Sequence, residues 1–117
     1  MQTNETPIDN AFIAQELTKL KPYALVILKK GPNYERPDTP ERIRTQHLPY
    51  VFKLKAQGIV AITMPVRDTT DVTAIGIFTV TDKGQVKQYM EADPAVIEGI
   101  FLYEIVNAIG LQGDTLL

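Results

Sequence analysis

The sequence predicts an α+β fold of the split βαβ, or ferredoxin-like, type: a four-stranded antiparallel sheet with both core helices on one face. Three observations predict it. Short apolar runs rich in β-branched residues occur four times along the chain. Two segments with helical spacing of apolar residues separate the first run from the second and the third from the fourth. A short polar turn joins the second and third runs, so the core order is β-α-β-β-α-β.

Length and composition favour a single domain over residues 1–117. A chain of 117 residues with 44% hydrophobic residues can form one compact core. The formal net charge is −2 and the basic residues form no long stripe, so nucleic acid is not an expected partner. No apolar run approaches the ~20 residues that span a bilayer, and residues 1–6 lack the layout of a signal peptide. We therefore expect no membrane partner and a cytoplasmic location.

The chain begins with a loose segment, residues 1–7, and an added N-terminal helix precedes the core. Apolar residues recur at helical spacing over residues 8–20, with polar residues between them. Pro22 is expected to stop this helix, because proline breaks the helical hydrogen-bond ladder. Residues 23–28 then form a short continuous apolar run, which indicates a buried strand. A proline-rich loop follows at residues 31–40.

The first core helix is expected over residues 40–57. The sequence Thr-Pro-Glu at 39–41 supplies a hydroxyl cap, a proline at the first helical position and an acid in the first turn. Gly58 is expected to end the helix. Pro49 lies inside this segment and removes one amide from the ladder, so we expect a kink or restart near His47.

A hairpin is expected next, with strands at residues 59–66 and 72–81 joined by a polar turn at 67–71. Ala74 and Gly76 lie on its second strand. Small residues there suggest that another layer packs closely against that face.

The second core helix and the last strand complete the core. Asp82 and Gln85 have the spacing of a capping box, and the helix must end before Pro94. The fourth strand is expected at residues 100–106, followed by a C-terminal tail at 108–117. Helices on one side leave the other, equally apolar sheet face uncovered, which usually marks association.

Few side chains are available for chemistry. The chain has one histidine, His47, no cysteine and no serine. Most zinc and iron sites need several imidazole or thiolate ligands, so no metal is expected. Without serine or cysteine nucleophiles, proton abstraction and return is the chemistry that remains. His47 suits it near neutral pH, although a histidine on the inner face of a helix is more often a packed core residue.

Asp93 is the candidate partner of His47. Aspartate before Pro94 is a usual cap of a short helix, and capping alone explains the residue. Its carboxylate could also accept a hydrogen bond from His47 and orient the imidazole. The two readings are compatible, because a carboxylate has two oxygens.

Other polar residues have two readings each. Arg44 could hold a substrate carboxylate or phenolate, or it could pair locally with Glu41. Tyr50 and Tyr23 could hydrogen-bond a ligand, or pack in the core with a wet hydroxyl. Glu104 lies among apolar neighbours and is either exposed at an edge or part of a pocket.

Three local patterns, taken in this topology, carry a resemblance to a known family. Residues 44–48 (Arg-Thr-Gln-His-Leu) are similar to an Arg-x-x-His-Leu opening of the first core helix. Residues 57–60 with Pro65 are similar to a Glu-Gly-x-Leu turn and a proline closing the next strand. Residues 91–94 with Gly99 are similar to an Ala-Asp-Pro-Tyr-x-x-x-Gly segment. Together they resemble the YCII-like family of the dimeric α+β barrel superfamily.

The resemblance covers about residues 23–107. It implies a homodimer with face-to-face sheets and a pocket in each subunit where His47 and Asp93 meet. One family member is a dehydrochlorinase acting on a chlorinated hydroxyquinol, and relatives in the superfamily include a muconolactone isomerase. This chain departs from the pattern at Met64, where glycine is common, and at Ala95, where tyrosine is common. Both positions are expected to line or border the pocket, so the substrate does not carry over.

The leading hypothesis is a small cofactor-free lyase or isomerase that acts on a small aromatic or lactone-like substrate. His47 would be the general base or acid and Asp93 would orient it, with Arg44, Tyr50 and Tyr23 binding the substrate. The alternatives are a non-catalytic dimeric module that binds a small molecule or regulates a pathway, and a purely structural dimer.

Two structural expectations separate these hypotheses. The side chains of His47 and Asp93 should lie within hydrogen-bonding reach beside a cavity. A homodimer should bury the sheet faces contributed by residues 23–28 and 72–81.

Overall fold

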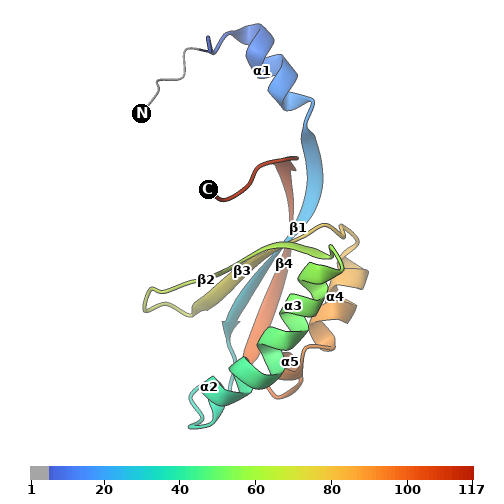
Figure 1. The fold of residues 1–117 in the computed structure, drawn as a ribbon. Coiled ribbons are helices and arrows are strands. Elements are labelled where there is room, and N and C mark those ends of the chain that lie inside the picture. Colours follow the sequence, from blue (N-terminus) through green and yellow to red (C-terminus); the bar gives the residue numbers. More distant parts are fainter. Residues whose placement is uncertain (1–5) are drawn as a thin grey trace.

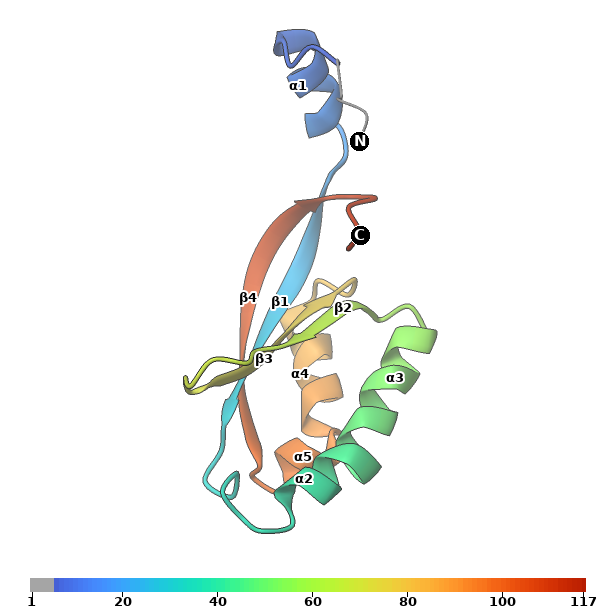
Figure 2. The same ribbon diagram turned by 60° about the vertical axis from the view of Figure 1, so that its left-hand side comes forward.

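The computed structural model describes residues 6–117 and has the α+β architecture that the sequence predicts (Figure 1). Its four strands are β1 (Leu20–Lys30), β2 (Val60–Pro65), β3 (Val72–Phe78) and β4 (Phe101–Leu111). They form one antiparallel sheet in the order β2-β3-β1-β4, which is the ferredoxin-like order. The helices α3 (Leu48–Ala56) and α4 (Lys83–Glu91) cover one face of this sheet (Figure 2).

The hydrophobic core lies between the sheet and these two helices. Along β1 the side chains of Ala24, Val26 and Leu28 are buried, whereas the residues between them are only half-buried. This alternation follows from the two-residue period of a strand, which turns successive side chains to opposite faces. The rest of the buried core cluster comprises Leu54, Val60, Phe78, Val86, Met90, Ala95, Ile100 and Phe101.

The first core helix is interrupted near His47, as Pro49 predicts. The short helix α2 (Thr39–Arg42) runs into a π-helical turn (Ile43–His47), and α3 then begins at Leu48. Within the turn, the Leu48 amide donates to the carbonyl five residues back, and Pro49 has no amide to restore the α-helical pattern. The expected glycine terminus is also present, because Gly58 has a φ of 74°.

The second core helix is capped as its sequence predicts. The Asp82 side chain accepts a hydrogen bond from the Gln85 amide at 3.0 Å, and α4 follows. The chain then breaks at Asp93 and forms one short helix, α5 (Pro94–Ile97), before β4.

The N-terminal helix is shorter than expected, and Pro22 does not end it. Helix α1 (Asn10–Leu17) ends at Leu17 rather than at residue 20, and β1 passes straight through Pro22. At Pro22, β1 pairs with β4 alone, because its pairing with β3 begins only at Ala24. Proline is tolerated there, since an edge position needs no amide on its free side.

The expected C-terminal tail at residues 108–117 is also wrong over its first four residues. Strand β4 continues to Leu111, because residues 108–111 pair with residues 20–23 of β1. The other strand and helix bounds shift by a few residues. Most of the loose segment expected at residues 1–7 lies outside the described residues.

Helix α1 projects away from the sheet and the other helices (Figures 1 and 2). Within residues 6–117, helix α1 buries none of its side chains, and Ile13 and Leu17 are exposed. In the same part of the chain, no helix is long and apolar enough to cross a membrane.

We call the sheet face opposite α3 and α4 the open face. Among the described residues, no helix lies over it (Figure 2). It carries Leu25 and Ile27 from β1 with their cross-strand neighbours Ile75, Ile77 and Val106. Glu104 also lies here, opposite Ile27, and forms an ion pair with Lys29. This decides between the two readings of Glu104, which is exposed on a sheet face and outside any pocket at the helical layer.

Candidate functional site

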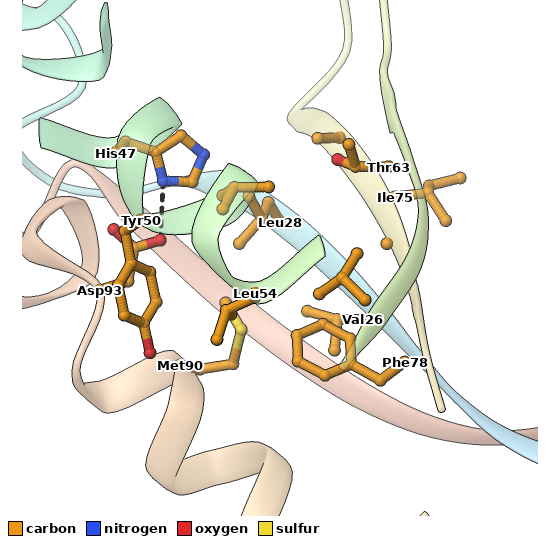
Figure 3. Close-up of a pocket in the computed structure, with 14 residues that line it drawn as sticks. Val26, Leu28, His47, Tyr50, Leu54, Thr63, Ile75, Phe78, Met90 and Asp93 are labelled. Atoms are coloured by element: carbon orange, nitrogen blue, oxygen red, sulfur yellow. Dashed lines mark hydrogen bonds and ion pairs between the residues drawn. The ribbon is translucent and has the colours of Figure 1, made fainter. Parts of the chain in front are cut away.

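A narrow cavity lies between the helical layer and the sheet, beside the π-helical turn (Figure 3). Its volume is about 40 Å³, which accommodates roughly three water molecules. Most of its lining is aliphatic or aromatic. The polar side chains that line it are those of His47, Tyr50, Thr63 and Asp93.

Small residues on β3 form the floor of this cavity. Ala74 and Gly76 face the helical layer, because they pair with Leu28 and Val26 of β1. The sequence suggested close packing at Ala74 and Gly76. A Cβ placed on Gly76 would make only ordinary contacts, the nearest at 3.7 Å with the Phe78 ring, so a small side chain would fit there without a clash.

His47 is the last residue of the π-helical turn, and its side chain borders the cavity. Its side chain is 8% exposed, and its ring packs edge-on against Phe101 with 5.0 Å between the ring centres. A π-turn shifts the helical register by one residue, and such turns are frequent at functional sites. Here the turn and the packing against Phe101 together hold the imidazole beside the cavity.

Asp93 holds the other side of the imidazole. Its Oδ2 lies 2.7 Å from His47 Nδ1, and its Oδ1 accepts a hydrogen bond from the Ala95 amide at 2.9 Å. Asp93 is therefore both the cap of α5 and the partner of His47, so the two readings of this residue hold together. The expectation of hydrogen-bonding reach beside a cavity is confirmed.

This geometry fixes which ring nitrogen is paired and which is free. An ionised Asp93 can only accept hydrogen bonds, so Nδ1 carries the proton of a neutral ring. Nε2 then keeps its lone pair, and it has no hydrogen-bond partner within residues 6–117. Nε2 points away from Asp93, toward the side of the cavity where Thr63 lies (Figure 3).

Tyr50 lines the cavity with its ring, but its hydroxyl is already engaged. The hydroxyl donates to the Tyr89 carbonyl at 2.6 Å, which ties α3 to α4. Burial raises the pKa of Tyr50, and the nearby Asp93 carboxylate adds to the shift. Tyr50 therefore stays neutral and shapes the cavity, and its hydroxyl is not directed to a ligand.

Arg44 and Tyr23 lie away from the cavity. The Arg44 guanidinium is exposed and donates to both carboxylate oxygens of Glu41, at 2.8 and 3.0 Å, which is the local pairing considered from the sequence. Tyr23 lies on the open face, and its ring is close to Gly110. Of the three substrate-binding candidates, all within the described residues, only Tyr50 therefore lines the cavity.

The two positions that depart from the family pattern also lie outside the cavity. Met64 pairs with Ile75 on the open face and is 46% exposed, and Ala95 is a buried residue of α5. The polar lining residue that the sequence did not reveal is Thr63. Regular strand alternation from the buried Val60 would place Thr63 on the open face, and nothing in the local sequence indicates that it turns inward.

A cluster of salt bridges fixes the backbone just before the π-helical turn. Arg42 donates to Asp38 at 2.8 Å and to Glu98 at 2.6 Å, so it joins α2 to the residue after α5. The hydrogen bond from Arg42 holds the pKa of Asp38 below its ordinary value.

Among residues 6–117, no three histidine, aspartate or glutamate side chains gather where they could hold a metal ion.

Comparison with solved structures finds a similar fold in an enzyme. It is the 5-chloro-2-hydroxyhydroquinone dehydrochlorinase of Burkholderia phenoliruptrix, in complex with 2,5-dihydroxybenzoquinone. The TM-score is 0.54 at 20% sequence identity, and the match covers 74% of this chain and 90% of the other. No family model and no curated protein matches the sequence.

Proposed function

We propose that this protein is a small lyase- or isomerase-type enzyme in which His47 moves a proton and Asp93 holds it in place, without a cofactor. One observation carries the proposal. The His47–Asp93 pair is buried, at 7% and 1% exposure, yet the free Nε2 faces a cavity rather than packed side chains. A merely structural histidine needs no such cavity.

The chemistry follows from the roles of the two residues. Nε2 removes a proton from a substrate carbon, and the resulting imidazolium is stabilised by the Asp93 carboxylate. In an isomerase, the same nitrogen returns the proton to another carbon. In a lyase, a leaving group departs with its bonding electrons from the neighbouring carbon.

The substrate class follows from the apolar lining and small volume of the cavity. A whole aromatic or lactone ring exceeds about 40 Å³ of space, so the reacting edge of the ring enters and the remainder stays at the opening. The ligand 2,5-dihydroxybenzoquinone of the structurally similar dehydrochlorinase is such a ring with oxygen substituents. We propose a small oxygenated ring of this kind.

We also propose membership in the YCII-like family and its assembly as a homodimer. Two motifs of the resemblance, residues 44–48 and residues 91–94, meet at the His47–Asp93 contact. The open face supports a dimer, because Met64, Leu102 and Val106 are 46%, 54% and 42% exposed on an apolar sheet surface.

The catalytic proposal is tested with wild type and His47→Gln. Thermal shift first identifies binding among 2,5-dihydroxybenzoquinone, substituted hydroquinones and small unsaturated lactones. NMR in D2O then follows deuterium entry into each bound compound. We expect wild type to accelerate exchange or isomerisation, and His47→Gln to lose about 10²–10⁴-fold of that rate while still binding.

The rival reading predicts a different result. A non-catalytic binding or regulatory module would bind one of these compounds without exchange, isomerisation or elimination in the wild-type protein. That result would replace the enzyme proposal with the binding module.

The dimer is tested by light scattering. We expect a mass of two 13.1 kDa chains for wild type, and a single chain for Ile27→Glu, which places a charge on the open face. Ile97→Glu is the matched control, because Ile97 is 69% exposed on α5 and should leave the dimer intact. A monomeric wild type at micromolar concentration contradicts the proposal.

A further inference from the structure

A β-bulge in β2 turns Thr63 toward the cavity. Val60 pairs with Phe78, and the next pair is Ile62 with Ile77, so Ala61 is an extra residue on the β2 side. Beyond this irregularity, Thr63 pairs with Gly76, on the face that the helices cover. Without the extra residue, strand alternation would point Thr63 to the open face. Bulges often re-aim a side chain beside an active site.

The surroundings of Thr63 leave its hydroxyl exposed to the cavity. Its cross-strand neighbour Gly76 has no side chain to cover it, and Thr63 is half-buried. Thr63 lies across the cavity from His47 (Figure 3). Other threonine hydroxyls bond to carbonyls, such as those of Thr39 and Thr79, but within residues 6–117 the Thr63 hydroxyl has no partner.

We infer that Thr63 is a substrate-contacting residue whose hydroxyl binds an oxygen substituent next to the carbon that His47 deprotonates. The inference rests on the proposed function and specifies its substrate as an enolisable carbonyl compound. Tyr50 cannot take this role, because its hydroxyl is committed to the Tyr89 carbonyl. Of the hydroxyls that line the cavity within the described chain, that of Thr63 is the free one.

The step balances with this arrangement. Nε2 of His47 accepts the proton of the C–H bond, and the electrons of that bond form the C=C bond of an enolate. The carbonyl π electrons move to the oxygen, which accepts a stronger hydrogen bond from Thr63 as its negative charge grows. The proton then returns to a different carbon. Alternatively, the enolate re-forms its carbonyl and expels a leaving group, with its bonding electrons, from the next carbon, and His47 gives its proton to the leaving group or to solvent.

Three variants test the role of the hydroxyl. Thr63→Val removes it and keeps the β-branched shape, whereas Thr63→Ser retains it. Thr73→Val is the matched control, because the Thr73 hydroxyl also lacks a partner among the described residues but lies on β3 away from this cavity. Circular dichroism melting confirms that each variant is folded.

The measurement is binding and deuterium exchange of 2,5-dihydroxybenzoquinone and a small unsaturated lactone. We expect Thr63→Val to weaken binding about fivefold, as the loss of one neutral hydrogen bond does, and to slow exchange further. Thr63→Ser should stay within about twofold of wild type, and Thr73→Val should be unchanged.

The outcomes separate the two proposals. Wild-type behaviour of Thr63→Val, while His47→Gln loses exchange, overturns the role of Thr63 and leaves the proposed function standing. Absence of binding to either compound by wild-type protein overturns the proposed substrate class, and the role of Thr63 with it.

Discussion

Two cross-strand pairs of the β2–β3 hairpin lie on opposite sides of the bulge and face the same helical layer. They differ in how well they fill the space beneath the helices. The pair Val60–Phe78 is buried at 4% exposure for each residue and packs between sheet and helices at the border of the cavity. The pair Thr63–Gly76 leaves that space empty beneath His47. We call them the sealed pair and the open pair. The difference shows that side-chain volume on one strand decides where a core packs and where it leaves a cavity.

Three irregular backbone segments lie around the cavity at the open pair. The π-helical turn ends at His47, the chain breaks at Asp93, and the bulge precedes Thr63. Each irregularity costs regular hydrogen bonding, and each aims a polar side chain into the same cavity. Departures from regular structure are expected where a chain builds a functional site.

The largest expected effect is at the sealed pair. Phe78→Ala removes a buried ring and should lower the free energy of unfolding by about 4 kcal/mol. Urea denaturation measures it, with Phe52→Ala as the control, because Phe52 is 56% exposed on α3. A loss as small as that of the control would mean that the sealed pair does not hold the core.

The next effect is at Asp93. Asp93→Ala removes the partner of buried His47 and a helix cap together, and should cost about 3 kcal/mol. Asp82→Ala removes only a cap, that of α4, and should cost about 1 kcal/mol. Denaturation of both variants isolates the histidine pairing. Equal losses would show that Asp93 acts as a cap alone.

A smaller effect on stability, with a large effect on binding, is expected at the open pair. Gly76→Val adds a side chain at the wall of the cavity, where a Cβ would make only ordinary contacts. It should leave stability unchanged or raise it by about 0.5 kcal/mol, because glycine is unfavourable within a strand, and it should abolish ligand binding. Gly110→Val is the control, on β4 away from the cavity. Retained binding in Gly76→Val would move the ligand site elsewhere.

The smallest effect is a pH dependence outside the cavity. Burial and a hydrogen bond from Tyr103 to Glu91 raise the pKa of Tyr103 from 10.0 to about 12. The folded state keeps its proton where the unfolded state loses it, so this contribution to stability is complete below pH 10 and is lost as the pH rises toward about 12. Urea denaturation between pH 9 and pH 11.5 should show a shallower decline for Tyr103→Phe than for wild type. Identical declines would contradict the shift.

Local chemistry made much of the fold and half of the site predictable. Proline chemistry alone predicted the break near His47, and capping chemistry predicted the start of α4 and the end of α3. Asp93 could be identified as a cap from Pro94, and as a histidine partner from the resemblance and topology. These features depend on residues a few positions apart, which a sequence displays directly.

Long-range pairing decided what the sequence did not show. Pro22 lies within a strand because β3 does not reach it, and residues 108–111 are ordered because β1 extends beside them. The same sheet carries Tyr23 to the open face, and Arg44 pairs with Glu41 rather than turning to the cavity.

The sequence by itself determined the order of the strands and helices, because this order follows from local spacing. It also singled out His47, because the chain has one histidine, whereas Asp93 became its candidate partner through the resemblance and the expected topology. Only the tertiary structure decided the cavity and the inward turn of Thr63. A bulge is a property of two paired strands, and an empty space is a property of all the residues that fail to fill it. Neither is encoded at any single position of the chain.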